Sequence, residues 1–349
     1  MYIYPYIIDN EKSIETYKNT LKYFEENPTV KDKIQELGII YSSVGNSVPQ
    51  TNINYWSGHS FPYSESWDDL QISTTLCFFG LYKQAYSTLR SGLELGLLSV
   101  YYNINDDGHL AVREWYYSLD SPESNTPRTE KIWKILLSNE NIKKYNDKFD
   151  LKSDYLSLGY LHNYVHTKGN KYSNSLDGKK GNSPIILASL MQDWIETYEK
   201  ITVIIITLHL LKYPLGLFEV DYIRKFGIDA PNVSQVNFNI KLISTLLEKE
   251  KLEFIQHIAN NDSQTKDILS ELNSIPNKTD DEIEEDIIKH EKLFASNYLG
   301  GFIKWEENQL KTMNDFIEKI PNLDIDDYKN DTLKRIEIIR KWAIENEIS

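Results

Sequence analysis

The chain contains 349 residues, of which 40% are hydrophobic and 26% charged, while glycine (15) and proline (11) are scarce. These values are typical of a globular protein with a sizeable core, and the shortage of helix-breaking residues favours α-helices. The formal net charge of −14 argues against broad, salt-driven binding to nucleic acid, because phosphate contacts need lysine and arginine. We therefore expect no extensive DNA binding, although a local basic patch is compatible with this composition.

The cysteine content and the N-terminal segment set further limits. Cys77 is the single cysteine, so neither an intramolecular disulfide nor a cysteine-rich zinc module can form, and its apolar neighbours predict a buried thiol. The N-terminal MYIYPYIIDNEKS lacks the basic start and the long apolar run of a signal peptide. The longest apolar run, residues 201–211, is about half as long as a bilayer-spanning helix needs. We predict a cytoplasmic protein with no membrane partner.

In chain order, the first segment combines two helices with a loop. Helical spacing of apolar residues predicts helices over residues 11–26 and 30–37. Residues 41–64 are rich in serine, asparagine, glycine and proline, which predicts a long loop. Its aromatic side chains indicate a lid or flap packed onto the body, and a ligand-lining role is the alternative.

From residue 66 a helical pattern continues for more than 35 residues and is apolar on nearly every side. A helix of this kind is covered by other helices and lies at the centre of a bundle. Thr88, Gly92 and Gly96 recur at a spacing of four, which predicts a groove where another element packs closely. A break near Phe79 and Gly80 is also predicted.

The remaining chain is predicted to be helical as well. Shorter helices are expected over residues 110–119, 129–137 and 141–149, then one over 154–169 with Asp154 as its N-cap, and a long one over 184–211. The best boundary lies in residues 215–236, which contain Gly216, Gly227 and Pro231. Beyond it, residues 229–349 carry 25 acids and 15 bases, a net charge of −10, and five further helical patterns. We predict an all-α protein with a helical domain over residues 1–228 and an acidic helical region over 229–349.

Arg90 and Glu94 are four residues apart on the central helix, so their side chains can meet as an intrahelical ion pair. Because the helix is otherwise apolar, both charges need partners, which also favours a polar cluster with groups from another helix.

His162 and His166 likewise share one face of a later helix. The zincin pattern needs glutamate directly after the first histidine, where this chain has Asn163, so no metal or other cofactor is predicted. The two imidazoles are then either structural groups bonded to a neighbouring helix or catalytic groups. Protonated His166 is favoured by the helix dipole in the last turn. The other histidines are isolated, and the acidic run DDEIEEDIIKHE (residues 280–291) is interpreted as a solvated helix face.

The stretches LRSGLELGLLSVYY (residues 89–102) and YLSLGYLHNYVHTKG (residues 155–169) together resemble a group of bacterial helical proteins related to HEPN domains. Those proteins carry Arg-Ser-x-x-Glu on a long central helix and Leu-x-x-[Tyr/Phe]-Val-His on a later one. The matching residues here are Arg90, Ser91 and Glu94, followed by Leu161, Tyr164, Val165 and His166. The resemblance covers roughly residues 66–212.

The resemblance implies an up-and-down helical bundle, often dimeric, within the predicted domain 1–228. Many HEPN proteins are ribonucleases of toxin or antiphage systems and use an Arg-x4–6-His motif. No arginine of this chain is followed by histidine at that distance, so Arg90 and His166 can meet only across helices.

On this basis the chain is predicted to be a component of a bacterial antiphage-defence or toxin-type system, acting as a metal-independent ribonuclease. His166 would be the general acid/base, Arg90 would stabilise phosphate charge, and Glu94 and His162 would orient them. The alternative is a non-catalytic interaction or sensor subunit in which the same four residues form a buried structural network. The predicted partners are another protein or a second copy of the chain, and RNA in the enzymatic case.

Overall fold

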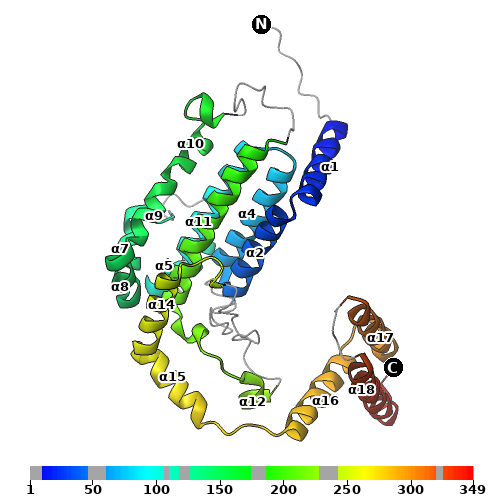
Figure 1. The fold of residues 1–349 in the computed structure, drawn as a ribbon. Helices are drawn as coiled ribbons and strands as arrows, with labels where there is room; N and C mark the ends of the chain where they lie inside the picture. Colours follow the sequence, from blue (N-terminus) through cyan, green and yellow to red (C-terminus); the bar gives the residue numbers. More distant parts are fainter. Residues whose placement is uncertain are drawn as a thin grey trace. The chain divides into compact units, whose positions relative to one another are not determined.

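The computed structural model describes residues 10–45, 60–105, 110–117, 126–173, 186–227, 243–319 and 325–348. Throughout these ranges the regular structure is helical and no strand occurs, which confirms the predicted all-α class (Figure 1). None of the helices in these ranges has the length and apolar character needed to cross a bilayer.

Two compact units make up the chain. Unit 1 combines Met1–Val220 with Asn232–Glu271, and unit 2 combines Asp221–Pro231 with Leu272–Ser349. The division between the two units therefore differs from the predicted boundary at residue 228. Helix α14 (Lys249–Asn261) lies beyond that boundary, but it buries Ile255, Ile258 and Ala259 in the core of unit 1. The end of unit 1 falls within α15 (Ser263–Ser274).

Unit 1 is built around a pair of helices that the predicted break separates. α4 (Ser60–Phe78) ends just before Gly80, which has a φ of 72°, and α5 (Tyr82–Asn105) begins after it. Glycine adopts this left-handed backbone conformation easily. The chain therefore reverses at Gly80, and α4 packs along α5. The other elements of unit 1 are α1 (Asn10–Glu26), α2 (Pro28–Gly45), α6 (Leu110–Tyr116), α7 (Thr129–Leu136), α8 (Glu140–Phe149), α9 (Leu151–Ser157), α10 (Leu161–His166), α11 (Ala188–Lys212), and the 3-10 turns η1 (Leu158–Tyr160), η2 (Asn170–Tyr172) and η4 (Pro214–Leu217).

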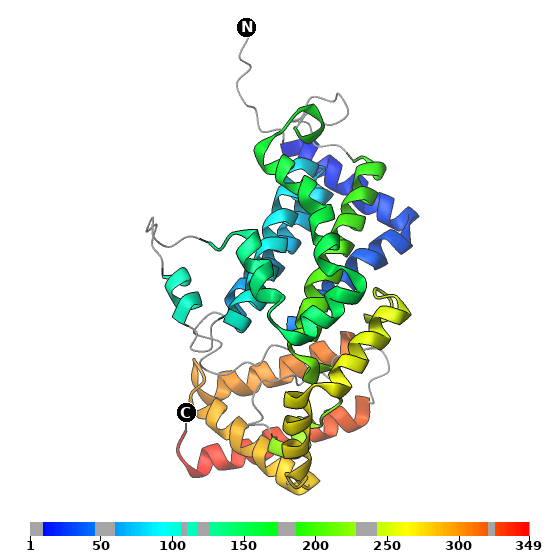
Figure 2. The same cartoon turned by 90° about the vertical axis from the view of Figure 1, so that its left-hand side faces the viewer.

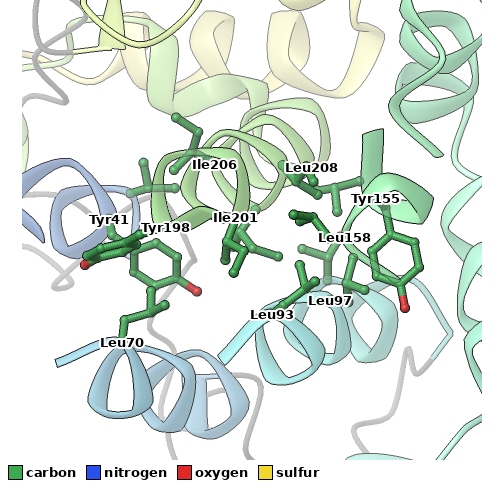
Figure 3. Packing of buried hydrophobic residues seen from close by; sticks show 14 of the residues in the cluster. Tyr41, Leu70, Leu93, Leu97, Tyr155, Leu158, Tyr198, Ile201, Ile206 and Leu208 are labelled. Carbon is green, nitrogen blue, oxygen red and sulfur yellow. The ribbon is translucent and has the colours of Figure 1, made fainter. Parts of the chain in front are cut away.

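The core of unit 1 lies between α5 and α11, as predicted for a central helix. Leu93 and Leu97 of α5 are buried, and Ile201 of α11 lies beside them (Figure 3). The predicted small-residue groove is confirmed on both sides. A Cβ on Gly92 would come within 3.2 Å of Leu70 of α4, and a Cβ on Gly96 within 2.8 Å of Ile205 of α11.

The predicted loop over residues 41–64 was wrong at both ends. α2 continues to Gly45 and α4 already begins at Ser60, while the lid or flap predicted between them lies outside the described residues. The helices extend because their terminal aromatic residues are core residues. Tyr41 and Tyr63 are buried and stack with ring centroids 5.0 Å apart.

The helix predicted over residues 154–169 is instead interrupted. α9 is followed by the 3-10 turn η1 before α10 begins, and α10 ends at His166 with Thr167 left-handed at φ 50°. Asp154 was the wrong cap, because the side chain of Asp150 accepts the hydrogen bond from the Ser153 amide. These turns change the directions in which the α10 side chains point.

Unit 2 is a separate arrangement of α16 (Asp280–Ser296), α17 (Gly301–Lys319) and α18 (Ile325–Glu345), which contact one another pairwise (Figure 2). Its core contains Phe302, Trp305 and Ile339. The short helix α12 (Tyr222–Phe226) belongs to the same unit, since Lys225 Nζ donates to the carbonyl of Ile275 at 2.7 Å and Arg224 pairs with Asp280.

Candidate functional site

α10 packs on α5, and two contacts and one shared pocket show how α5 is aligned with the α9–α10 segment. Lys83 Nζ donates to Thr167 Oγ1 at 2.8 Å. One turn further along α5, the ring of Tyr86 stacks on that of Tyr164, with centroids 4.4 Å apart and planes 10° apart. Further on, Glu94 lines the same pocket as Tyr155. α5 and the α9–α10 segment therefore run in opposite directions.

Arg90 and Glu94 form the ion pair that their spacing predicts. The Arg90 side chain is 14% exposed and that of Glu94 is 46% exposed, so the pair lies at the edge of the core. Because one partner is half exposed, we expect it to contribute about 1 kcal/mol or less to stability. The guanidinium is thus already occupied by a carboxylate of its own helix.

Ser91, the second residue of the Arg-Ser-x-x-Glu stretch, lies near Asp69 of α4. Burial raises the pKa of the Asp69 carboxyl, and the nearby Ser91 side chain opposes that rise. The stretch therefore faces α4 through Ser91 and also holds the Arg90–Glu94 pair.

His162 and His166 lie on the exposed face of α10, one turn apart, with ring centroids 4.2 Å apart. Within the described ranges, neither imidazole hydrogen-bonds another group, and no cluster of three metal-binding side chains is present. The pair is accessible to solvent. This exposure contradicts the prediction of a buried network that includes both histidines.

The four residues thus form two pairs in the structure, and the predicted contact of Arg90 with His166 is not among their interactions. Lys83 is level with Thr167, and Arg90 lies seven residues further along α5. At 1.5 Å per residue this places Arg90 roughly 10 Å along the helix from the level of His166. The structure brings His162 and His166 together and leaves Arg90 with Glu94.

Three lysines near the histidine pair were missed by sequence reasoning. Lys83 reaches Thr167, directly after His166, and Lys168 and Lys171 are exposed in the following residues. Lys171 Nζ lies 5.7 Å from the ring centroid of Tyr172. In a chain of net charge −14 this is a locally cationic surface. Lys83 comes from α5, so no sequence spacing could have revealed it.

The pocket that Glu94 and Tyr155 line is a hollow at the side of the Arg90–Glu94 pair. It has a volume of about 350 Å³ and is lined by Leu97, Ile132, Arg128 and Tyr155, among others. Thr129 Oγ1 lies 3.4 Å from Tyr155 OH at its wall. Arg128 is exposed here, and sequence reasoning assigned it no role. This pocket lies on the Arg90–Glu94 side and is separate from the histidine pair.

His209 lies elsewhere, on α11, and is fully buried. Desolvation lowers its pKa to about 4, opposed by the hydrogen bond of Nδ1 with the Ile205 carbonyl at 2.7 Å. The ring also packs edge-on to Tyr63, with centroids 4.8 Å apart. His209 is therefore a residue of the core.

Cys77 is buried as predicted. Burial raises the pKa of its thiol well above the ordinary value, so the reactive thiolate is disfavoured.

Comparison with known proteins gives no match, whether to a family model, to a curated protein or to a solved structure.

Proposed function

We propose that the exposed face of α10 is an RNA-binding and RNA-cleaving surface, in a protein that acts in a bacterial antiphage-defence or toxin-type system. The observation that supports this proposal is the juxtaposition of two accessible imidazoles, 4.2 Å apart, with Lys83, Lys168 and Lys171. Two imidazoles can supply a base and an acid, and lysines can hold a phosphate without a metal ion.

The chemistry assigned to this surface is transesterification within the RNA backbone. His166, in its neutral form, takes the proton of a 2′-hydroxyl, and the resulting oxygen attacks the adjacent phosphorus. The bond from phosphorus to the 5′-oxygen breaks, and protonated His162 donates a proton to that leaving oxygen. The products are a 2′,3′-cyclic phosphate and a 5′-hydroxyl. The lysines offset the charge that develops on the phosphoryl oxygens.

In this proposal Arg90 loses the phosphate-binding role that the sequence suggested. Its guanidinium is paired with Glu94, and its position on α5 is about two helical turns from the level of His166. Lys83 takes this role, because its ammonium lies next to Thr167 and comes from the facing helix. Arg90 and Glu94 then form an intrahelical ion pair of α5 with no part in the chemistry.

A second candidate function is a non-catalytic interaction or sensor subunit. It is favoured by the lack, within the described ranges, of a hydrogen bond that would orient either imidazole. Catalytic histidines are commonly held in one orientation by such a partner. In this case the same surface of α10 is a contact face for another macromolecule.

The experiment is cleavage of a 5′-labelled single-stranded RNA by the purified full-length protein in the presence of EDTA. The variants are His162→Ala, His166→Ala and the double substitution. His257→Ala is the matched control, because His257 is also exposed on a helix of unit 1. We expect wild type and control to generate 2′,3′-cyclic phosphate ends, and each α10 variant to lose activity by about 10²-fold or more.

Equal cleavage by the double variant and wild type would overturn the enzymatic proposal. Binding of the RNA without any cleavage would favour the second candidate. Expression in cells provides the same comparison, with RNA fragmentation and growth arrest expected for wild type and absent for His166→Ala.

A further inference from the structure

Helix α16 of unit 2 has its charges separated along its length. Its N-terminal half is acidic and its C-terminal half contains Lys289, His290 and Lys292. Several of the acids are used within unit 2. The intramolecular ion pairs are Asp280 with Arg224, Glu284 with Lys334, Asp286 with Lys278, and Glu291 with Arg335.

A second set of charges on α16 has no such ion pair among the described residues. Asp281, Glu285 and Lys289 are exposed and follow one another at intervals of four, and Lys292 comes three residues later. This spacing places all four on one stripe of the helix. The stripe therefore runs from two unpaired acids to two unpaired bases.

The basic end of this stripe borders a hollow between α16 and α18. The hollow has a volume of about 470 Å³, and Lys289, Lys292, Leu293 and Trp342 are among its lining residues. Lys292 Nζ lies 5.6 Å from the ring centroid of Trp342, and Leu293 is 62% exposed. An acidic side chain that enters here meets two ammonium groups beside an apolar wall.

We propose that the occupant is a second copy of this chain, whose α16 lies antiparallel to the first. A two-fold axis on the stripe's face of the helix, at the axial level of residue 287, places Glu285 of each copy opposite Lys289 of the other. The same axis brings Asp281 of each copy close to Lys292 of the other. A two-fold interface uses the same patch of both copies, so the patch must be complementary to itself. This stripe meets that requirement, because its acidic half can face the basic half of the other copy.

Helix electrostatics favour the same arrangement. Antiparallel packing places the N-terminal end of each α16 beside the C-terminal end of the other, so the helix dipoles attract. The contacts are at the surface, and we expect association that weakens as salt is added. The inference concerns unit 2 alone and does not depend on the proposed function of α10.

The test is sedimentation velocity of the full-length protein over a range of concentrations, in about 50 mM and about 500 mM NaCl. At low salt we expect the mass to rise with concentration from 40.8 kDa toward twice that value. Glu285→Lys and Lys289→Glu should each weaken the dimer by about tenfold or more, because each replaces two attractive contacts per dimer by two repulsive ones. Lys311→Glu, at an exposed position of α17, is the control for charge reversal.

Two rescue experiments separate a direct contact from a general charge effect. The double variant Glu285→Lys with Lys289→Glu should dimerise like wild type, because every opposite pair is restored. A mixture of the two single variants should form a heterodimer, since one copy then carries only bases and the other only acids at these positions. A wild-type chain that stays monomeric at all concentrations would overturn the proposal. A dimer insensitive to both single variants, or a mixture that fails to associate, would also overturn it.

Discussion

His209 Nε2 lies 3.1 Å from Ser99 Oγ in the closed core between α11 and α5. The Ile205 carbonyl, which contacts Nδ1 of the same ring, can only accept a hydrogen bond, so Nδ1 carries the proton. Nε2 is then the unprotonated nitrogen and faces Ser99 Oγ, whose own proton is donated to the Gly96 carbonyl at 2.8 Å. The ring is fully buried in its neutral form, and no carboxylate among the described residues contacts it to stabilise a cation.

The first prediction is that His209 makes the protein less stable in acid. Its pKa is about 4 in the folded state and 6.5 in the unfolded state, so the unfolded chain binds the proton more readily. The contribution is negligible above pH 6.5, grows as pH falls below that value, and levels off near pH 4. Between pH 7.5 and 5 we expect a loss of about 2 kcal/mol in the free energy of unfolding from this group.

Urea unfolding at both pH values measures this loss, with His209→Gln as the reference that lacks the titrating group. The difference between wild type and variant matters, because other groups also titrate in this range. If the free energies of unfolding of the two proteins fall equally from pH 7.5 to 5, His209 is not held neutral by burial.

The second prediction concerns the contact of α5 with α11. A Cβ at Gly96 would lie 2.8 Å from the Ile205 side chain and 3.0 Å from Tyr41 OH, both in the core. Gly96→Ala should therefore lower the free energy of unfolding by about 1–3 kcal/mol, because over-packing outweighs the gain in helix propensity. Gly159→Ala is the matched control, since no atom lies within 4 Å of the Cβ it would add. A Gly96 variant as stable as the control would contradict the close packing.

The fold could be predicted from sequence where a local signal and the core agree. Gly80 separates α4 from α5 because glycine adopts its left-handed φ easily. Gly92 and Gly96 indicate close packing, because glycine inside a helix is destabilising unless a neighbouring element leaves no room for a side chain. The ends of the loop predicted over residues 41–64 could not be predicted correctly. Tyr41 and Tyr63 stack on each other in the core and so extend α2 and α4. Because this contact is between two separate helices, no local sequence pattern indicates it.

The candidate site shows a similar limit. A spacing of four correctly predicted that Arg90 meets Glu94 and that His162 meets His166. Such spacing states which side chains share a face, but not whether that face is buried or which helix it meets. The 3-10 turn η1, which precedes α10, and the facing Lys83 are set by tertiary packing, so the exposure of the histidines had no sequence signal.

The third prediction is that Arg90 and Glu94 support structure and take no part in RNA cleavage. Arg90→Ala combined with Glu94→Ala should leave the cleavage rate within about threefold of wild type, because the pair lies about two helical turns from the level of His166. A double-mutant cycle in urea unfolding should give a coupling energy of about 1 kcal/mol or less. Loss of cleavage comparable with that of His166→Ala, in a folded protein, would restore Arg90 to the catalytic site.

The fourth prediction is that Lys168 and Lys171 contribute to RNA binding through phosphate contacts. Each is exposed close to the histidine pair, and neither forms an ion pair within the described part of the chain. Each alanine substitution should weaken binding of a labelled single-stranded RNA and lower the magnitude of the slope of log K against log salt by about 0.7, because one phosphate contact is lost.

Lys311→Ala serves as the control on α17. Fluorescence anisotropy of the RNA at several salt concentrations gives both quantities, and His162→Ala/His166→Ala protein prevents cleavage during the measurement. An unchanged slope in both lysine variants would show that RNA, if bound, contacts another surface, because a phosphate contact cannot be removed without changing the number of released counterions.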